Sequence, residues 1–403
     1  MRTLVMPFGI SARCRRDIYA VLAVSFVWGA ASASGQTPTT ALGLGAPVAA
    51  IDARAAALGG TGIGLLGGSL SARNPADMGF FERRVLGITY APEDVTVKGS
   101  GGELGTGRSR IPVLRGAIPI DKWTLGVAFA SELDQDWQVE FSDTLNVSLG
   151  TFPFTERRTA DGGVSSVNFT VVRRVGGIRL GVEYGILTGN LRQRFVRDFE
   201  PDTADVDNRI ASALGVASWS YAGSRFRMGI ASDVTDKIRV SADLSLQGDL
   251  TATRDSSGVT LDRRSFEMPT AFEAGASAQI SPRLLVTGAF GWTGWSGTKA
   301  VGTDFVASDI VWMGVGAEIQ GVRLLGARLP VRLGFRRTDL PFHASDLSQL
   351  TETALTLGVG LRVSDEQAKI DLALEFGSRG DLESSGVEES FQRLSLTVAL
   401  FQL

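Results

Sequence analysis

The chain of 403 residues has little of the chemistry that most enzymes and metal proteins use. It contains one cysteine and one histidine, which excludes a disulfide framework, a cysteine–histidine zinc site and a redox thiol pair. Lys and Arg number 40 against 43 Asp and Glu, so the basic excess that nucleic-acid binding requires is absent. We therefore expect no cofactor, no metal, no nucleic-acid partner and no enzymatic activity.

What the chain does have is a moderate apolar content and much glycine. Hydrophobic residues make up 44% and charged residues 21%, which excludes both a disordered tail and a helical membrane protein. The 49 glycines are spread along the sequence without a collagen period. Residues 1–403 are long enough for two or three soluble domains, so length alone does not decide the architecture.

The N-terminus has the pattern of a secretory signal peptide. Basic residues (Arg2, Arg13, Arg15 and Arg16) precede the apolar run 18–30, and small residues follow it. The run is shorter than the ~20 apolar residues that a spanning helix needs, which argues against a membrane anchor. We expect cleavage after Ala33 or Gly35, so that residues 1–35 and Cys14 within them are lost on export.

From Arg83 onward the sequence alternates apolar and polar residues, which is the period of a β-strand. Between 237 and 250 the even positions run from Ile238 through Leu244 to Leu250, whereas the odd positions carry Arg239, Asp243 and other polar residues. The same division recurs in 178–186, 270–280 and 369–376. Each of these segments is expected to have one apolar and one charged face.

The lengths of the connections indicate a transmembrane barrel. The expected strands are 83–91, 110–119, 122–142, 164–174, 178–196, 209–233, 237–253, 268–280, 283–296, 309–319, 329–338, 353–364, 369–378 and 390–403. Tight links alternate with long polar ones (92–109, 143–163, 197–208, 254–267, 297–308, 339–352 and 379–389), as short periplasmic turns alternate with external loops; the link 320–328 is of middling length. The turn-like residues Tyr221 to Ser224 would split 209–233, but one bent crossing keeps the strand number even.

A soluble β-protein would also alternate, so other features must decide between them. The expected strands are longer than the ~5–6 residues usual in globular sheets. Aromatic residues at strand ends are placed as interface girdles would be (Trp123, Trp137, Trp292, Trp295 and Trp312). We therefore predict an all-β antiparallel transmembrane barrel of about fourteen strands, in the outer membrane of a diderm bacterium.

Three parts of the chain resemble the FadL-like outer membrane transporters. The first is the small-residue stretch 53–62 followed by Ser71-Ala72-Arg73-Asn74-Pro75-Ala76. The second is Met268-Pro269 with the hairpin that ends at Trp292-Thr293-Gly294-Trp295-Ser296. The third comprises residues 332–335, Pro341, 358–361 and 371–373, which are similar to the late strands of that family.

The resemblance implies an organisation and a function. Residues 36–82 would form a plug in the lumen of a barrel made by 83–403, and the channel would take up hydrophobic small molecules, such as long-chain fatty acids, passively. In that family the ligand leaves sideways at a kink in the third strand. Here the third strand, 122–142, is interrupted by the polar residues 131–136. The interruption indicates either a lateral opening or the start of an external loop at 132.

Candidate ligand-binding residues lie in the plug and near one loop. In the plug they are Arg54, Asn74, Pro75 and Ala76, of which the last three equally suit a structural turn. Near the loop Arg192, Arg194 and Arg197 could bind an anionic head group. The charged strand faces indicate a wet, charge-balanced lumen (Asp243, Asp249, Glu183, Asp371, Glu375, Arg239, Arg332 and Arg336). His343 is expected to be a solvated loop residue beside Asp346.

A second function class remains open on the same residues. The N-terminal signature also resembles that of PorV-type barrels, which act as secretion-system scaffolds and bind protein partners. Apolar side chains in the plug and upper lumen would favour transport, whereas an apolar external patch would favour a scaffold. A rim cluster of Ser, Asp and His343 would instead favour an enzyme. In either of the first two classes we expect outer membrane lipids, periplasmic chaperones and the barrel assembly machinery as partners.

Overall fold

The computed structural model describes residues 44–99, 102–147, 150–199, 212–255, 263–298, 305–324, 327–344, 348–363, 367–385 and 387–401. The expected signal peptide, 1–35, lies outside the described residues. None of the described helices is long and apolar enough to cross a membrane.

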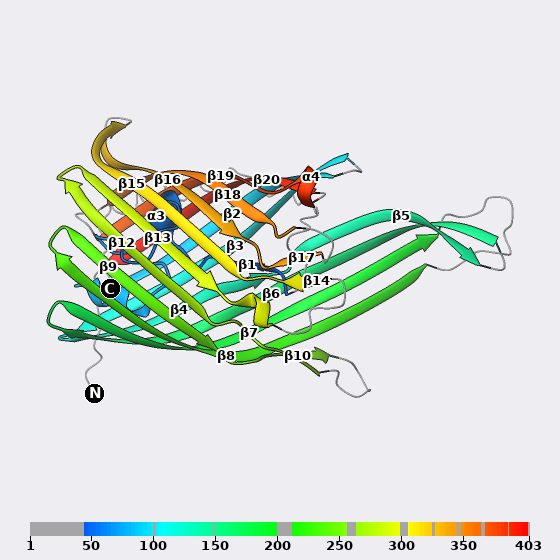
Figure 1. Cartoon of the computed structure of the whole chain (residues 1–403), viewed down its shortest axis with the longest axis horizontal. Helices are drawn as coiled ribbons and strands as arrows, with labels where there is room; N and C mark the ends of the chain where they lie inside the picture. The colour runs from blue at the N-terminus through cyan, green and yellow to red at the C-terminus, as the bar shows by residue number, and fades with distance from the viewer. Residues whose placement is uncertain are drawn as a thin grey trace, which may run out of the picture.

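The protein is a closed antiparallel barrel with fourteen crossings, as predicted (Figure 1). The crossings are β2 (Val85–Gly99), β3 (Gly102–Ile120), β4 (Trp123–Asp134), β6 (Gly150–Val175), β7 (Ile178–Phe199), β8 (Ala213–Thr235), β9 (Ile238–Gln247), β12 (Ala271–Ser281), β13 (Leu284–Thr293), β15 (Ile310–Leu324), β16 (Ala327–Asp339), β18 (Thr351–Val363), β19 (Ala368–Asp381) and β20 (Val387–Phe401). Pairing of β2 with β20, from Val85↔Phe401 to Lys98↔Glu388, closes the barrel.

Shorter elements complete the described chain. They are β1 (Ala46–Pro47), α3 (Ala53–Ala57), η1 (Pro75–Phe80), β5 (Trp137–Val147), β10 (Leu250–Asp255), β11 (Arg263–Phe266), η2 (Trp295–Gly297), β14 (Phe305–Ala307), β17 (Phe342–Ala344) and α4 (Leu382–Ser385). Strands β1, β5, β10 and β11 join the barrel sheet, whereas β14 pairs with β17 alone. Among the described residues of this region, Ala213–Thr235 form one strand, β8, with no turn at Tyr221, as predicted.

The alternation in sequence becomes an apolar outside and a polar inside. In β9 Leu244 is 36% exposed and Asp243 is 2% exposed, because successive side chains point to opposite faces. The same holds for β7, where Leu180, Val182 and Tyr184 are exposed. The pattern fails at Leu250, which lies in the lumen. Residues 248–249 separate β9 from β10, and the facing of the side chains reverses there.

Several predicted loops are in fact strands. Residues 92–109 continue β2 and β3 up to the pair Gly99↔Gly102, and residues 143–163 continue β5 and β6 up to Val147↔Gly150. The link 320–328 likewise belongs mostly to the hairpin of β15 and β16. Beyond the apolar belt both faces of a strand can meet water, so these segments need no apolar alternation. They therefore resemble loops in sequence.

The predicted aromatic girdle is correct only in part. Trp123 and Trp292 are exposed on the outside of the barrel, but Trp295 and Trp312 are buried and Trp137 packs against the buried cluster around Leu133. A position near the end of a strand does not determine whether a side chain points outwards or into the lumen. Trp295 and Trp312 therefore belong to the lumen.

Candidate functional site

The segment from Leu44 to Phe81 lies inside the barrel, where α3 contacts β18, β19 and β20 and η1 contacts β7 and β8 (Figure 1). Asp52 begins α3 by accepting a hydrogen bond from Ala55 N at 2.8 Å. The other oxygen of Asp52 accepts a hydrogen bond from Ser69 Oγ at 2.8 Å, so that one carboxylate joins two parts of the segment. We call residues 44–81 the luminal segment.

Asn74, Pro75 and Ala76 form a turn that is fixed to the wall. Asn74 Oδ1 accepts a hydrogen bond from Ala76 N at 2.7 Å, and Asn74 Nδ2 donates to Ser241 Oγ at 2.5 Å. Gly229 makes this approach sterically feasible, because a Cβ there would lie 1.9 Å from Asn74 Oδ1. The described contacts of the turn are therefore structural, and a ligand contact by these three residues stays a prediction.

Wall arginines bind the backbone of the luminal segment. Arg227 Nη1 donates to Ala72 O at 2.5 Å, and its Nη2 donates to Arg73 O. Arg115 reaches across to Ser71 O and to Asn74 O. Carbonyl groups that would be buried without partners are thereby satisfied by charged donors.

Arg54 also joins the luminal segment to the wall, but this arginine belongs to the luminal segment itself. Its guanidinium forms two hydrogen bonds with Glu318, at 2.9 and 3.1 Å, and its Nη1 donates to the carbonyls of Leu66 and Gly68. Glu318 also accepts a hydrogen bond from Arg332 at 2.6 Å, and Arg332 continues to Asp371 at 2.7 Å. In the structure Arg54 therefore holds the luminal segment to the wall, and ligand binding by it stays a prediction.

A second charged cluster lies on the wall towards the long-loop end. Its centre is Glu93, which is 1% exposed. Glu93 binds four arginines at 2.7 to 3.2 Å: Arg108, Arg110, Arg379 and Arg393. Glu352, Glu375 and Glu389 supply further negative charge to Arg379 and Arg393. We call this group the Glu93 cluster.

The charges that were expected to face the lumen do so, and most of them are buried. Of the strand residues on which that expectation rested, Asp249 is exposed, and the rest are buried: Glu183, Asp243, Asp371, Glu375, Arg239, Arg332 and Arg336. The sequence showed that charges face inward. Their burial against the luminal segment depends on tertiary structure.

Asp77 is a buried carboxyl group of the luminal segment itself. Its two oxygens accept hydrogen bonds from Gly64 N and Ser241 Oγ, both at 3.0 Å. Burial raises the pKa of Asp77 above its usual range, and these two hydrogen bonds lower it to a smaller extent.

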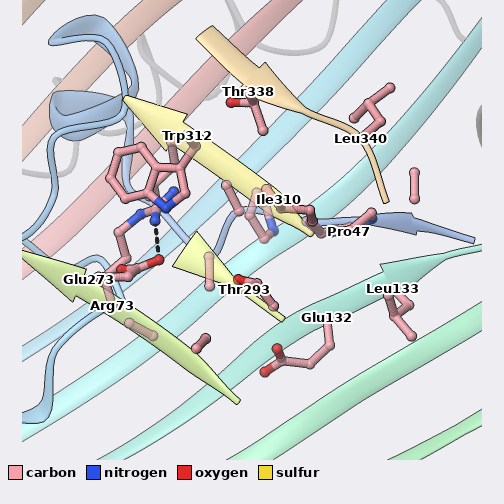
Figure 2. A pocket seen from close by; sticks show the side chains of 18 of the residues that line it. Pro47, Arg73, Glu132, Leu133, Glu273, Thr293, Ile310, Trp312, Thr338 and Leu340 are labelled. Carbon is pink, nitrogen blue, oxygen red and sulfur yellow. Dashed lines mark hydrogen bonds and ion pairs between the residues drawn. The ribbon is translucent and has the colours of Figure 1, made fainter. Parts of the chain in front are cut away.

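A cavity of about 250 Å³ lies between the luminal segment and the long-loop end (Figure 2). On one side Arg73 forms an ion pair with Glu273 at 2.5 Å and stacks on Trp312 at 4.0 Å. On the other side the cavity meets a buried apolar cluster, which includes Leu133, Val164, Leu187, Met268, Trp295 and Ile310. The cavity thus has apolar residues along one side, while charged residues line its floor and also reach its upper part, where Arg108 and Arg110 of the Glu93 cluster lie.

The barrel wall is incomplete beside this cavity. Pairing of β3 with β4 ends at Val113↔Ala130, and beyond it β3 pairs only with β2 among the described strands. Pro112 is the next residue of β3, and the register of β3 against β2 shifts beside it. We call this unpaired boundary between β3 and β4 the seam.

Side chains and a short strand cross the seam where backbone pairing is missing. Ser131 Oγ donates to Ile111 O at 2.9 Å, and Arg108 and Arg110 of β3 reach Asp134 of β4 at 3.4 and 3.3 Å. β1 also pairs here, with Ala46 opposite Asp134. The predicted interruption of 122–142 is present at 135–136, between β4 and β5.

The three arginines predicted to bind a head group do not lie together. Arg192 and Arg194 are exposed on one face of β7, and Arg197 has the opposite parity and lies on the other face. Arg197 Nε donates to Glu156 at 2.6 Å, so the carboxylate that it meets belongs to this chain. A shared anion site for the three is not supported by this arrangement.

His343 lies in the short strand β17 and not in an extended loop. Its Nε2 is 3.0 Å from Ser308 Oγ. The neighbouring Asp309 is bound instead to Trp292 Nε1 and Ser296 N. Asp346 lies outside the described residues. Among the residues that the structure describes, no group of three or more His, Cys, Asp or Glu could hold a metal ion.

A second cavity, of about 540 Å³, lies on the opposite side of the luminal segment, towards the short turns. Phe80, Phe81, Lys369 and Asp371 are among its lining residues. Arg54 and the chain from Leu66 to Leu70 contribute to the same wall. The luminal segment therefore separates two chambers.

Comparison with known proteins places this architecture in a family. The sequence matches the BamG family model over residues 14–402. The chain belongs to the BamG family. A search among curated proteins finds no match to this BamG-family sequence.

Solved structures similar to this BamG-family chain are outer membrane barrels. The toluene transporter TbuX of Ralstonia pickettii is 18% identical, with a TM-score of 0.57 over 88% of this chain and 99% of that one. A FadL homologue from Pseudomonas aeruginosa is 12% identical, with a TM-score of 0.58 and the same coverages. The toluene transporter TodX of Pseudomonas putida is 16% identical, with a TM-score of 0.55 over 90% and 100%. At these identities the likeness shows the fold, and that fold implies an outer membrane location.

Reasoning from the sequence missed the Glu93 cluster and the seam contacts of Arg108, Arg110 and Asp134. Glu93 and Arg108 fall in the segment 92–109 that was expected to be a loop, and Arg110 begins the expected strand that follows it. A signal was present in the strict alternation of Asp94-Val95-Thr96-Val97-Lys98, which has the period of a strand. The pairing of Glu93 with Arg108 follows once these residues form a hairpin.

Proposed function

We propose that this protein is a passive channel that takes hydrophobic small molecules from outside the cell into the cavity and releases them sideways into the membrane. The observation that carries the proposal is that the cavity lies at the seam. Arg110 and Pro112 of β3 and Leu133 of β4 belong both to the cavity lining and to the two sides of the unpaired boundary.

The distribution of polarity supports a sideways route over an axial one. Below the cavity the luminal segment is bound to the wall by Arg54, Arg115 and Arg227 through buried hydrogen bonds. Above it the apolar cluster offers surface that a hydrophobic molecule would cover. TbuX and TodX, which share the fold, are described as toluene transporters.

The proposal includes the organisation of the chain. Residues 1–35 direct export and are removed, residues 36–82 form the plug, and residues 83–403 form the barrel in the outer membrane of a diderm bacterium. The exposed apolar side chains of β7, β9 and β18 then contact lipid. Long-chain fatty acids and aromatic hydrocarbons are the ligand classes to be tested first.

Chemical closure of the seam tests this function. In a Cys14→Ser background, Arg110→Cys and Asp134→Cys are joined by a short bifunctional thiol reagent, since the native side chains lie 3.3 Å apart. Uptake of a fluorescent fatty acid and of toluene by intact cells should fall at least ~5-fold and recover on reduction of a cleavable linker.

A matched pair of introduced cysteines on the wall outside the apolar belt controls for effects of the cross-linking reaction itself. Arg157→Cys and Glu140→Cys replace an exposed ion pair of 2.7 Å on β6 and β5. Linking them should leave uptake unchanged. Full uptake through a linked seam would refute the sideways route.

A second candidate is a scaffold associated with barrel assembly, favoured by the name of the family to which the chain belongs. The firmly held luminal segment suits a barrel that need not conduct. This candidate predicts that seam closure leaves uptake unaltered. It also predicts that deletion of the gene lowers the amounts of other outer membrane barrels, measured by quantitative proteomics of isolated membranes.

A further inference from the structure

Four strands of the barrel continue beyond the apolar belt as a projecting sheet, formed by β5 and the adjoining parts of β6, β7 and β8 (Figure 1). On its outer face the side chains change from Val182, Tyr184 and Ile186 near the membrane to Arg192 and Arg194 further out. Such a change from apolar to charged side chains indicates that the sheet stands in water.

β5 is an open edge of this sheet. All eleven of its residues pair with β6, from Trp137↔Ala160 to Val147↔Gly150. No other described strand pairs with β5. Alternate N–H and C=O groups along its other side are therefore without a backbone partner from the described sheet.

The edge has few of the usual protections against pairing, since Glu140 and Asp143 are its only charged residues. Its sequence, Trp-Gln-Val-Glu-Phe-Ser-Asp-Thr-Leu-Asn-Val, contains no proline, lysine or glycine and is rich in residues that favour strands. Exposed edges of this length are rare in isolated proteins because they pair with other chains. The neighbouring crossing β3 is unpaired on the facing side from Gly102 to Ile111, so two open edges border one gap.

The chain itself shows that this side of the sheet accepts a strand. β1 pairs antiparallel with Leu133 and Asp134 of β4, on the side that faces the seam. β5 follows β4 after residues 135–136 and pairs with the same neighbour, β6. The free side of β5 thus continues the side on which β1 is bound.

Side chains on the inner face would meet an added strand. The face that carries the contacting rings of Phe154 and Phe199, 5.9 Å apart, continues on the edge strand β5 through Trp137 and Leu145, which would be next to an added strand. An apolar residue at every second position of a bound strand would extend this aromatic face. Polar residues at the intervening positions would lie with Ser142 and Thr144, which are exposed.

From these observations we infer that the free edge of β5 binds an extended polypeptide segment of another exported protein by strand addition. The ligand is a chain with alternating apolar and polar residues, held by main-chain hydrogen bonds. This surface is separate from the cavity and does not depend on the channel function.

Photo-cross-linking to a synthetic strand tests the inference on the full-length chain in detergent. The probe is a peptide of alternating Val and Thr, about as long as β5, and a second peptide carries Pro at every other position. In a Cys14→Ser background, Thr144→Cys and Arg194→Cys each receive a benzophenone. Arg194 is equally exposed but lies in β7, which has strands on both sides.

The Val–Thr peptide should cross-link to Thr144→Cys at least ~10-fold more than to Arg194→Cys, and the Pro peptide to neither. Amide hydrogen exchange should slow within 137–147 and not within 178–186 when the Val–Thr peptide is added. Equal cross-linking at the two positions, or unchanged exchange in β5, would overturn the inference. Protection of β5 that appears with protein concentration alone would overturn it in favour of self-association.

Discussion

The middle of the lumen and its long-loop end are built by opposite means. In the middle, buried charges such as Arg54, Glu318 and Arg332 bind the luminal segment and each other at hydrogen-bond distance. At the long-loop end, an apolar cluster borders a cavity that charged side chains also line, beside an unpaired stretch of wall. Directional hydrogen bonds and ion pairs therefore hold the luminal segment in place, whereas the apolar cluster offers a passing ligand only weak, non-directional contacts.

The largest expected effect comes from removal of the central carboxylate of the Glu93 cluster. Glu93→Ala leaves four arginines buried without their shared partner, so the free energy of unfolding should fall by about 3–5 kcal/mol. Urea unfolding in lipid vesicles measures it. Glu140→Ala removes an exposed ion pair with Arg157 and should cost under about 1 kcal/mol. Equal losses of unfolding free energy in the two variants would mean that the Glu93 cluster stabilises the fold no more than an exposed ion pair does.

The next largest loss of stability is expected from substitutions on the two faces of β9. Leu244→Arg places a charge towards lipid and should cost about 2–4 kcal/mol if it lies at mid-depth. Asp243→Leu should also be costly, because Arg227, 3.1 Å away, loses a buried partner. The double variant Asp243→Leu, Arg227→Leu should not recover that loss, because Arg227 also donates to the buried carbonyls of Ala72 and Arg73. A tolerated Asp243→Leu would show that the lumen is wet there.

The addition of a methyl group at Gly229 tests how closely the luminal segment approaches the wall. Gly229→Ala places a Cβ 1.9 Å from Asn74 Oδ1 and should destabilise the protein by about 1–3 kcal/mol through displacement of the turn. Gly177→Ala is the matched control, since the nearest atom to its Cβ is 4.0 Å away. Protease cleavage within 44–81 should increase in the first variant only. Identical digestion of both would contradict tight packing of the luminal segment.

The smallest effect concerns Asp77, whose folded-state pKa is raised mainly by burial. A raised carboxyl pKa means that the folded state holds its proton more tightly. Stability from this group is therefore present below the unfolded pKa of ~3.9 and is lost as pH rises through the folded pKa. Asp77→Asn should flatten this part of the pH profile. A profile unchanged by the substitution would show that Asp77 does not contribute to it.

Prediction from the sequence was strongest where the membrane imposes a pattern. The parity of Asp243 and Leu244, the single strand β8 and the barrel class follow from alternation in a chain that must hide its backbone from lipid. Prediction failed where that requirement ends. The strands outside the belt at 92–109 and 143–163 face water, and at 248–249 a local break reversed the facing of Leu250.

The candidate site was predictable only in outline. The signature around Asn74 correctly marked a segment bound within the barrel, because its small residues allow close packing against strands. The grouping of Arg192, Arg194 and Arg197 failed, because residues of odd and even number in a strand lie on opposite faces. The partnership of Glu93 with Arg379 joins residues far apart in sequence, and no local pattern encodes it.

The amino-acid sequence alone determined that this chain forms a barrel, which side chains face lipid and which face inward, because those features follow from local period and from the solvent on each side. Tertiary structure alone decided which charges pair, where the wall is left unpaired and which strand edge stays open. These outcomes depend on distances between residues of different strands, and they are set only when the strands and the luminal segment pack together.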